Sequence, residues 1–249
     1  KLSVRSPDVI DSSEEINHFK KLKPDLVIVV AYGKILPPTL LNIEKTLFIN
    51  VHASLLPKWR GAAPIQRSIM DMDEETGISI MKIIPKLDAG PVLMQSRIKI
   101  NRDFTFEKLS EKLSKLGAKL ILDALKLIEN NKFHFVEQNE SEATYAKKIE
   151  KSEAKINWNE DANKIIAKIN ALYPNPGSWF EYLGNRIKII KAKEIYKSGE
   201  PGSIIDNNFT IACYKNAIQL LELKKEGKQK MTVNEFLRGN LIKIGHKLI

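Results

Sequence analysis

Two polar residues, Asn50 and His52, end an apolar, strand-like run in the first third of the chain. Alternate residues of a β-strand point to the same face, and both side chains carry hydrogen-bond donors. Two donors aimed at one oxygen can stabilise the negative charge that develops when a carbonyl group is attacked. An isolated Asn-x-His pair also has a structural interpretation, in which Asn50 caps a turn and His52 packs in the interior. The pair alone leaves both interpretations open.

Asp88 favours the chemical interpretation. It lies between two predicted strands, close to Gly90, a residue that permits a tight turn beside a pocket. A carboxylate brought against His52 would orient the imidazole ring and stabilise its protonated form. A hydrolytic triad of Ser54, His52 and Asp88 is disfavoured, because Ser54 is not on a nucleophile elbow. A metal site at His52 and Asp88 lacks a third ligand at a usual spacing. The predicted catalytic residues are therefore Asn50, His52 and Asp88, with no metal.

Other classes of chemistry find no support in the sequence. It contains no Walker A sequence, no G-x-G-x-x-G and no G-x-S-x-G. The single cysteine, Cys213, has no partner for a disulfide or a thiolate metal site. The apolar run near the start is too short to span a membrane, and no charged-then-apolar leader precedes it. We expect a soluble, cytoplasmic protein that is a monomer and does not bind membranes.

The residues around the predicted site alternate between strand and helix signals. Residues 26–30 are apolar at every position, which is typical of a parallel strand buried on both faces. Further strands are predicted at 47–51, 77–83 and 92–100, and helices at 12–22, 65–70 and 106–129, the last with a leucine stripe that covers a sheet. These are βα units of an open α/β sheet. Ligands bind such sheets at the carboxyl ends of the strands, where Asn50 and His52 lie.

The last two fifths of the chain have a different character. Residues 137–152 are polar without an apolar period and are predicted to be an interdomain linker. A helix at 161–172 is followed by short strand signals at 178–182, 186–196, 202–205, 209–214 and 217–224, which together suggest a small β-barrel of the type that binds oligonucleotides.

Positive charge is concentrated in this second part. The whole chain has 40 Lys+Arg and 30 Asp+Glu, a net charge of +10, and a count over residues 151–249 gives 17 and 10, or +7. Such a surface suits a polyanion such as RNA, which basic proteins bind by releasing counterions from the phosphates. The excess of Lys over Arg is equally compatible with a drift in codon composition.

A longer motif carries a family resemblance. Residues 50–61 read Asn50-Val51-His52-Ala53-Ser54-Leu55-Leu56-Pro57-Lys58-Trp59-Arg60-Gly61, with Asp88 downstream. This pattern resembles the folate-dependent formyltransferases, which share an Asn, a His and an Asp in this order. Residues 30–37, 61–67, 76–81 and 143–149 are similar to the branch of that family that acts on initiator tRNA. The resemblance covers nearly the whole chain.

The resemblance implies a fold and a reaction. It implies a Rossmann-like formyltransferase domain with a mostly parallel sheet at 1–136, a linker at 137–152, and a basic oligonucleotide-binding-like β-barrel domain at 153–249. It further implies 10-formyltetrahydrofolate as the formyl donor and the amino group of methionyl initiator tRNA as the acceptor. The folate pocket would be lined by two segments, Lys34-Ile35-Leu36 and Ser54-Leu55-Leu56-Pro57. Asn50 and His52 would meet the oxyanion, and Asp88 would hold His52 and help to pass the amine proton.

Three alternatives and one further expectation accompany this interpretation. The alternatives are a 10-formyltetrahydrofolate-dependent transferase for a small acceptor, a formyltetrahydrofolate hydrolase, and a non-catalytic RNA-binding protein that has kept the fold. The basic second domain favours a tRNA acceptor over a small one. Because residues 26–30 read as an interior strand with little sequence before them to flank it, we also expect the chain to be part of a longer protein.

Overall fold

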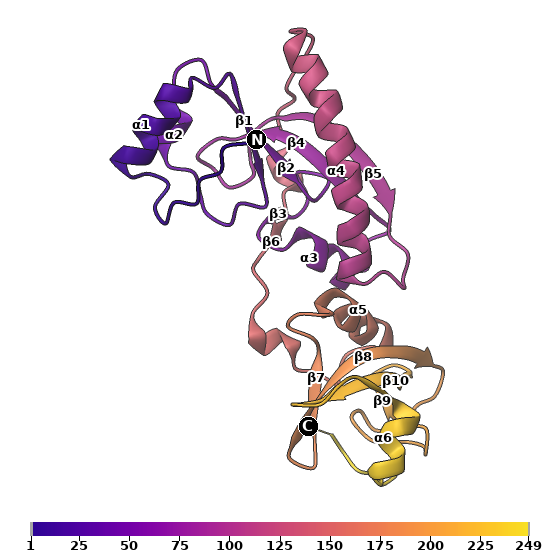
Figure 1. The fold of residues 1–249 in the computed structure, drawn as a ribbon. Coiled ribbons are helices and arrows are strands. Elements are labelled where there is room, and N and C mark those ends of the chain that lie inside the picture. Colours follow the sequence, from indigo (N-terminus) through magenta and orange to yellow (C-terminus); the bar gives the residue numbers. More distant parts are fainter. Residues whose placement is uncertain (1, 249) are drawn as a thin grey trace. The chain divides into compact units, whose positions relative to one another are not determined.

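The computed structural model describes residues 2–248, so that Lys1 and Ile249 lie outside the described residues. The chain folds into two compact units that interleave along the sequence (Figure 1). The first unit comprises Lys1–Pro64, Thr76–Ile98 and Leu113–Ala146, and the second comprises Ile65–Glu75, Lys99–Lys112 and Lys147–Ile249. The linear domain bounds given above stay a prediction.

The helices and strands follow the predicted order with a few short additions. The helices are α1 (Ser13–Leu22), α2 (Pro38–Leu41), α3 (Pro64–Met70), α4 (Phe106–Glu129), α5 (Ala162–Leu172) and α6 (Val233–Gly239). The strands are β1 (Leu26–Val30), β2 (Leu47–His52), β3 (Arg60–Gly61), β4 (Glu75–Lys82), β5 (Val92–Lys99), β6 (Tyr145–Ala146), β7 (Trp179–Tyr182), β8 (Asn185–Ile195), β9 (Thr210–Ala212), β10 (Ala217–Lys225) and β11 (Met231–Thr232). The sequence patterns do not predict the short helices α2 and α6 or the two-residue strands.

The first unit is built on a four-stranded sheet with the order β1-β2-β4-β5. Strand β1 is parallel to β2, and β4 is antiparallel to β2. The α/β class is confirmed, but the sheet is mixed, because β4 returns beside β2 without a crossover that would make it parallel. Helix α4 packs closely on this sheet at Gly117, where a Cβ would lie 3.2 Å from Cγ1 of Val51 and 3.6 Å from Cδ1 of Ile78.

Strand β1 differs from its prediction. It lies at the end of the described sheet order, and the side chains of Ile28 and Val30 are 41% and 63% exposed. The predicted burial of this strand on both faces is therefore wrong for these residues of the described chain. Its other face is covered by a cluster around Leu36, Leu40 and Phe48, which Val27 and Val29 join.

The second unit is an antiparallel sheet with the order β11-β10-β8-β7, on which β9 also pairs with β10. Its core gathers side chains from α5, the strands and α6, among them Ile165, Phe180, Phe209 and Phe236. The strand-rich module is confirmed. The strand pairings within residues 2–248 do not close the sheet, so the predicted barrel is an open sheet in the structure. Residues 202–205 contribute only isolated bridges to Ile211 and Lys247, not a strand.

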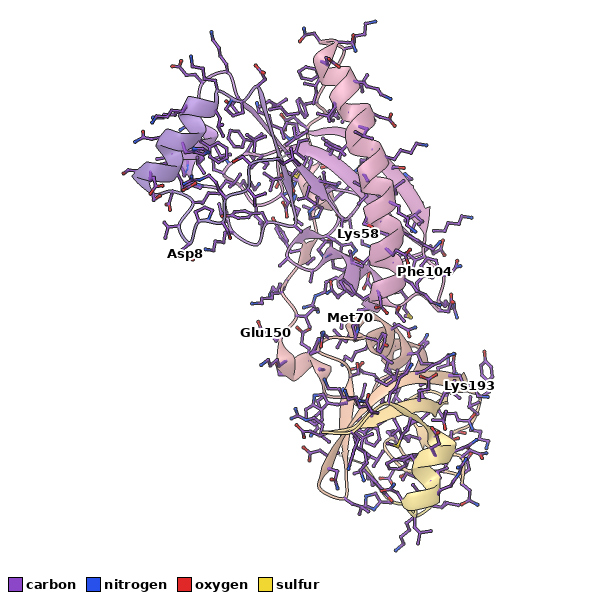
Figure 2. All side chains as sticks on the ribbon, in the orientation of Figure 1. Asp8, Lys58, Met70, Phe104, Glu150 and Lys193 are labelled. Atoms are coloured by element: carbon purple, nitrogen blue, oxygen red, sulfur yellow. The ribbon has the colours of Figure 1, made fainter. Side chains whose placement is uncertain are left out.

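Positive side chains project from this sheet. On β8, apolar residues such as Ile187 and Ile189 point into the core, and Lys191 and Lys193 are exposed (Figure 2 labels Lys193). The register with β10 shifts next to Lys191, and this irregularity interrupts the alternation, so Lys191 and Lys193 are exposed although they continue the spacing of the buried Ile187 and Ile189. No helix within residues 2–248 has both the length and the apolar character needed to cross a membrane.

Candidate active site

Strand β2 carries the first two predicted catalytic residues. Asn50 pairs with Val29 on one side and with Met81 on the other, and His52 pairs with Ser79. Because the two residues are two positions apart on the strand, their side chains point to the same face of the sheet. Asn50 is half-buried and keeps access to the surface, and His52 is only 6% exposed.

Both ring nitrogens of His52 face oxygen atoms. Nε2 lies 2.9 Å from the carbonyl oxygen of Trp59, which can only accept, so Nε2 carries the proton and donates. Nδ1 lies 3.6 Å from Oδ2 of Asp88. The predicted encounter of His52 with Asp88 is present in the structure.

Burial decides the charge of His52. It lowers the pKa of the imidazole, and this effect outweighs the opposing effects of Asp88 and of the Trp59 carbonyl, which both raise the pKa. The expected stabilisation of the imidazolium by Asp88 is therefore outweighed, and the ring is neutral at neutral pH. A neutral imidazole with a carboxylate beside it is suited to accept a proton.

Asp88 is held in a special backbone conformation in the loop between β4 and β5. Its φ is 44°, in the left-handed region that non-glycine residues rarely adopt. The carboxylate oxygen that faces His52 accepts a hydrogen bond of 2.8 Å from the backbone N–H of Gly61. Gly61 has a φ of 115°, and a Cβ at this position would lie 2.9 Å from the carbonyl oxygen of Ala146. Only glycine fits where β3 brings this N–H to Asp88.

The segment predicted to bind folate after β2 is fixed by a second network. The Ser54 hydroxyl donates to the carbonyl of Lys58 at 2.5 Å, so it is not directed at His52 as a triad would require. The hydroxyl of Ser79 donates to the carbonyl of Ser54 and accepts from the N–H of Leu56, at 2.7 and 3.0 Å. Gln95 donates to the carbonyl of Leu56 at 2.8 Å. Leu56 is buried, and Leu55 and Pro57 are half-buried.

The other predicted folate segment is divided between surface and core. Lys34 is exposed and Ile35 is 70% exposed, whereas Leu36 is buried against Leu40 and Phe48. Leu36 therefore packs in the core of the first unit, and of the three residues only Lys34 and Ile35 are open to a ligand.

Sequence reasoning misses a group of residues behind Asp88. Arg60 is fully buried and is bonded to Gln138 and Glu140, and Gln138 is bonded to the backbone on both sides of Ala89. The sequence gives Arg60 a place in the motif but no role, and the polar composition of residues 138–140 predicts a linker. One sequence feature could have pointed to these residues: Arg60 lies in a motif that follows a buried strand, and a buried arginine needs polar partners. Within residues 2–248, no group of three or more His, Cys, Asp or Glu residues could hold a metal ion.

Both parts of the chain match known protein families. A family described as "Formyl transferase" matches residues 5–125, and one described as "Formyl transferase, C-terminal domain" matches residues 148–241. The chain is 49% identical over 249 residues to a protein of Pelagibacter ubique named methionyl-tRNA formyltransferase, and the match covers 99% of this chain and 80% of that protein. A protein of the same name from Bradyrhizobium diazoefficiens is 41% identical over 248 residues, which cover 98% of this chain and 80% of that protein.

Among solved structures, HypX from Aquifex aeolicus in complex with tetrahydrofolic acid has a similar fold. The TM-score is 0.68 at 19% identity, and the match covers 93% of this chain and 44% of that one. At this identity the likeness concerns the fold alone.

Proposed function

The chain belongs to the methionyl-tRNA formyltransferase family, and on this basis we propose that it transfers the formyl group of 10-formyltetrahydrofolate to the amino group of methionyl initiator tRNA. The match to relatives of that name over nearly the whole chain carries the proposal. The enzyme is thus a one-carbon group transferase of translation initiation.

The half-buried Asn50 is suited to stabilise the transition state. Attack of a neutral amine on the formyl carbon forms a carbon–nitrogen bond and leaves negative charge on the formyl oxygen. The Asn50 amide is accessible at the end of β2 and supplies a donor for this oxyanion. The N–H of His52 already donates to Trp59, so oxyanion donation from His52 would require this bond to be shared or broken.

His52 and Asp88 are suited to move the proton. The attacking amine must lose a proton, and the folate nitrogen must gain one when its bond to the formyl carbon breaks. A neutral His52 can accept the amine proton, and the Asp88 carboxylate near Nδ1 stabilises the imidazolium that forms. Return of the proton to the folate nitrogen completes the transfer with no net change in the enzyme.

The two substrates have different binding requirements. The half-buried Leu55 and Pro57 after β2, with the exposed Ile35, offer apolar surface for a flat pterin ring. The +7 charge of residues 151–249, exposed in part on β8, suits the phosphates of tRNA.

We place the enzyme in the cytoplasm as a monomer, a state that a sedimentation measurement of its mass in solution would test.

An assay with competing acceptors tests the function. The purified chain is given 10-formyltetrahydrofolate and either methionyl initiator tRNA, glycinamide ribonucleotide or a nucleotide amino sugar. We expect formylation of the tRNA only. Formylation of a small acceptor would favour another formyltransferase, release of formate without an acceptor would favour a hydrolase, and tRNA binding without reaction would favour a binding protein.

A further inference from the structure

The backbone of Asp88 needs external support. A positive φ at a residue with a Cβ is strained and persists only where the surroundings hold it. The carboxylate must also stay within reach of His52, and its Oδ2 lies 3.6 Å from Nδ1 in the structure. The groups that fix this loop therefore matter for the site.

The side-chain amide of Gln138 brackets the loop. Its Nε2 donates to the carbonyl of Asp88 at 2.8 Å and to the carbonyl of Gly90 at 2.7 Å. Its Oε1 accepts from Nε and Nη2 of Arg60, at 3.0 and 2.8 Å. Because arginine has no acceptor, the oxygen of the amide must face Arg60, and the amide nitrogen is thereby directed at the two carbonyls.

Arg60 is itself fixed by charge. Its guanidinium is fully buried and is bonded to both carboxylate oxygens of Glu140, at 2.8 and 3.2 Å. Lys86 approaches the same carboxylate at 2.7 Å. Hydrogen bonds from Arg60 and Lys86 lower the pKa of Glu140 to about 2, so the carboxylate stays ionised and the arginine keeps its partner.

The same strand, β3, holds both ends of Asp88. The N–H of Gly61 donates to the Asp88 carboxylate, and the side chain of the preceding residue, Arg60, acts through Gln138 on the Asp88 carbonyl. Strand β3 is in turn paired with β6, where Arg60 lies opposite Tyr145. The loop is therefore tied to β3 by two sets of bonds, one direct and one through Gln138.

We propose that Gln138, oriented by Arg60, is a positioning residue that holds Asp88 at the distance from His52 at which its carboxylate acts on the imidazole. The proposal rests on the proposed function for its effect on turnover. Its effect on the His52–Asp88 distance is independent of any substrate. Gln138 does not touch the reacting groups and acts only through Asp88.

The test compares three variants of the full chain. Gln138→Met keeps the length of the side chain and removes all its hydrogen bonds, and Gln138→Asn keeps an amide that is one methylene too short to span both carbonyls. Asn139→Ala is the matched control, because the bonds of this neighbouring amide within residues 2–248 go to Ser141 and Glu142 of its own turn. Each variant is measured for thermal unfolding, for kcat and KM with both substrates, and for the His52 pKa by NMR of the imidazole nitrogens.

We expect Gln138→Met to lower kcat by about 10-fold to 100-fold, since a small displacement of a catalytic group is enough for such a loss. KM for both substrates should stay within about twofold, because the folate and tRNA surfaces are untouched. The His52 pKa should fall below that of the unmodified enzyme, because Asp88 is the charge that raises it. Gln138→Asn should show a smaller change in the same direction, and Asn139→Ala should show none.

The NMR measurement separates this proposal from the proposed function. If the unmodified chain failed to formylate methionyl-tRNA, the His52 pKa would still report the position of Asp88. An unchanged kcat and an unchanged His52 pKa in folded Gln138→Met would overturn the proposal. Loss of folded protein in both Gln138 variants would also count against it, because the amide would then maintain the fold and not one carboxylate.

Discussion

The backbone N–H of Gly61 donates to Oδ2 of Asp88 at 2.8 Å, and this is the carboxylate oxygen that lies closest to His52. The bond connects the motif that follows β2 to the loop that follows β4. A carboxylate that accepts from a rigid backbone donor has a fixed direction, so its effect on His52 is fixed as well. The site is therefore assembled from two loops of one sheet that a glycine brings together.

Replacing Asn50 should affect the chemical step more than binding. We expect Asn50→Ala to lower kcat by about 10²-fold to 10³-fold, the usual cost of removing an oxyanion donor. KM for the folate should change little, because the oxyanion exists only after attack has begun. Steady-state kinetics with methionyl-tRNA measure both values. A variant with normal kcat would show that Asn50 has no role in the reaction.

Replacing Asp88 should change both the rate and its pH dependence. Asp88→Asn removes the charge that raises the His52 pKa, while the burial that lowers it remains, so the pKa falls further. We expect a loss in kcat of about 10²-fold or more, and an acid limb displaced to lower pH. Asp123→Asn, a half-buried carboxylate on α4 that pairs with Lys126, is the control and should behave as the unmodified enzyme. A full-rate Asp88→Asn enzyme would contradict the proton-transfer role.

The unmodified enzyme should lose stability in acid through His52. The pKa of this residue is lower in the folded chain than in the unfolded chain, where it is about 6.5. Below that value the unfolded state binds more protons, so the free energy of unfolding decreases as the pH falls from about 6.5 towards the folded-state pKa. Urea unfolding at a series of pH values measures this slope, and His52→Asn should reduce it. An equal slope in both proteins would show that other groups cause it.

The positive charge of the second unit should appear in the salt dependence of tRNA binding. We expect Lys191→Gln combined with Lys193→Gln to weaken binding and to reduce the slope of log affinity against log salt, by about 0.9 for each duplex phosphate that a lysine no longer neutralises. Lys119→Gln combined with Lys126→Gln, on the exposed face of α4, is the matched control. An identical slope for both double variants would indicate that the lysines of β8 do not contact tRNA and that their number reflects only the lysine-rich composition of the chain.

Cys213 should be inert in the folded enzyme. Burial raises the pKa of its thiol to about 12, so almost no thiolate is present at neutral pH. A colourimetric thiol reagent should react with it in denaturant and not under native conditions, and loss of activity should not accompany treatment of the folded protein. Rapid modification of the native chain would show that the second unit opens readily.

The sequence by itself determined the longer elements and the residue types of the site. The apolar runs of β1, β2 and β4 and the leucine stripe of α4 are local patterns, and local patterns report the face that a residue presents. The position of Asn50 and His52 at the end of a strand followed from the same periodicity. Asp88 was identified because it follows a strand beside Gly90.

The tertiary structure decided what surrounds those residues. Gln138 falls in a predicted linker because polar composition does not distinguish a solvated residue from one that is bonded to a buried arginine. The sequence predicts that Asp88 stabilises protonated His52, but in the structure burial lowers the pKa of His52 by more than Asp88 raises it. Desolvation depends on all the surroundings of the ring and not on one neighbour, so the sequence pattern does not reveal it. The mixed sheet, the exposed residues of β1 and the open sheet of the second unit likewise depend on pairings between distant strands, which no local pattern specifies.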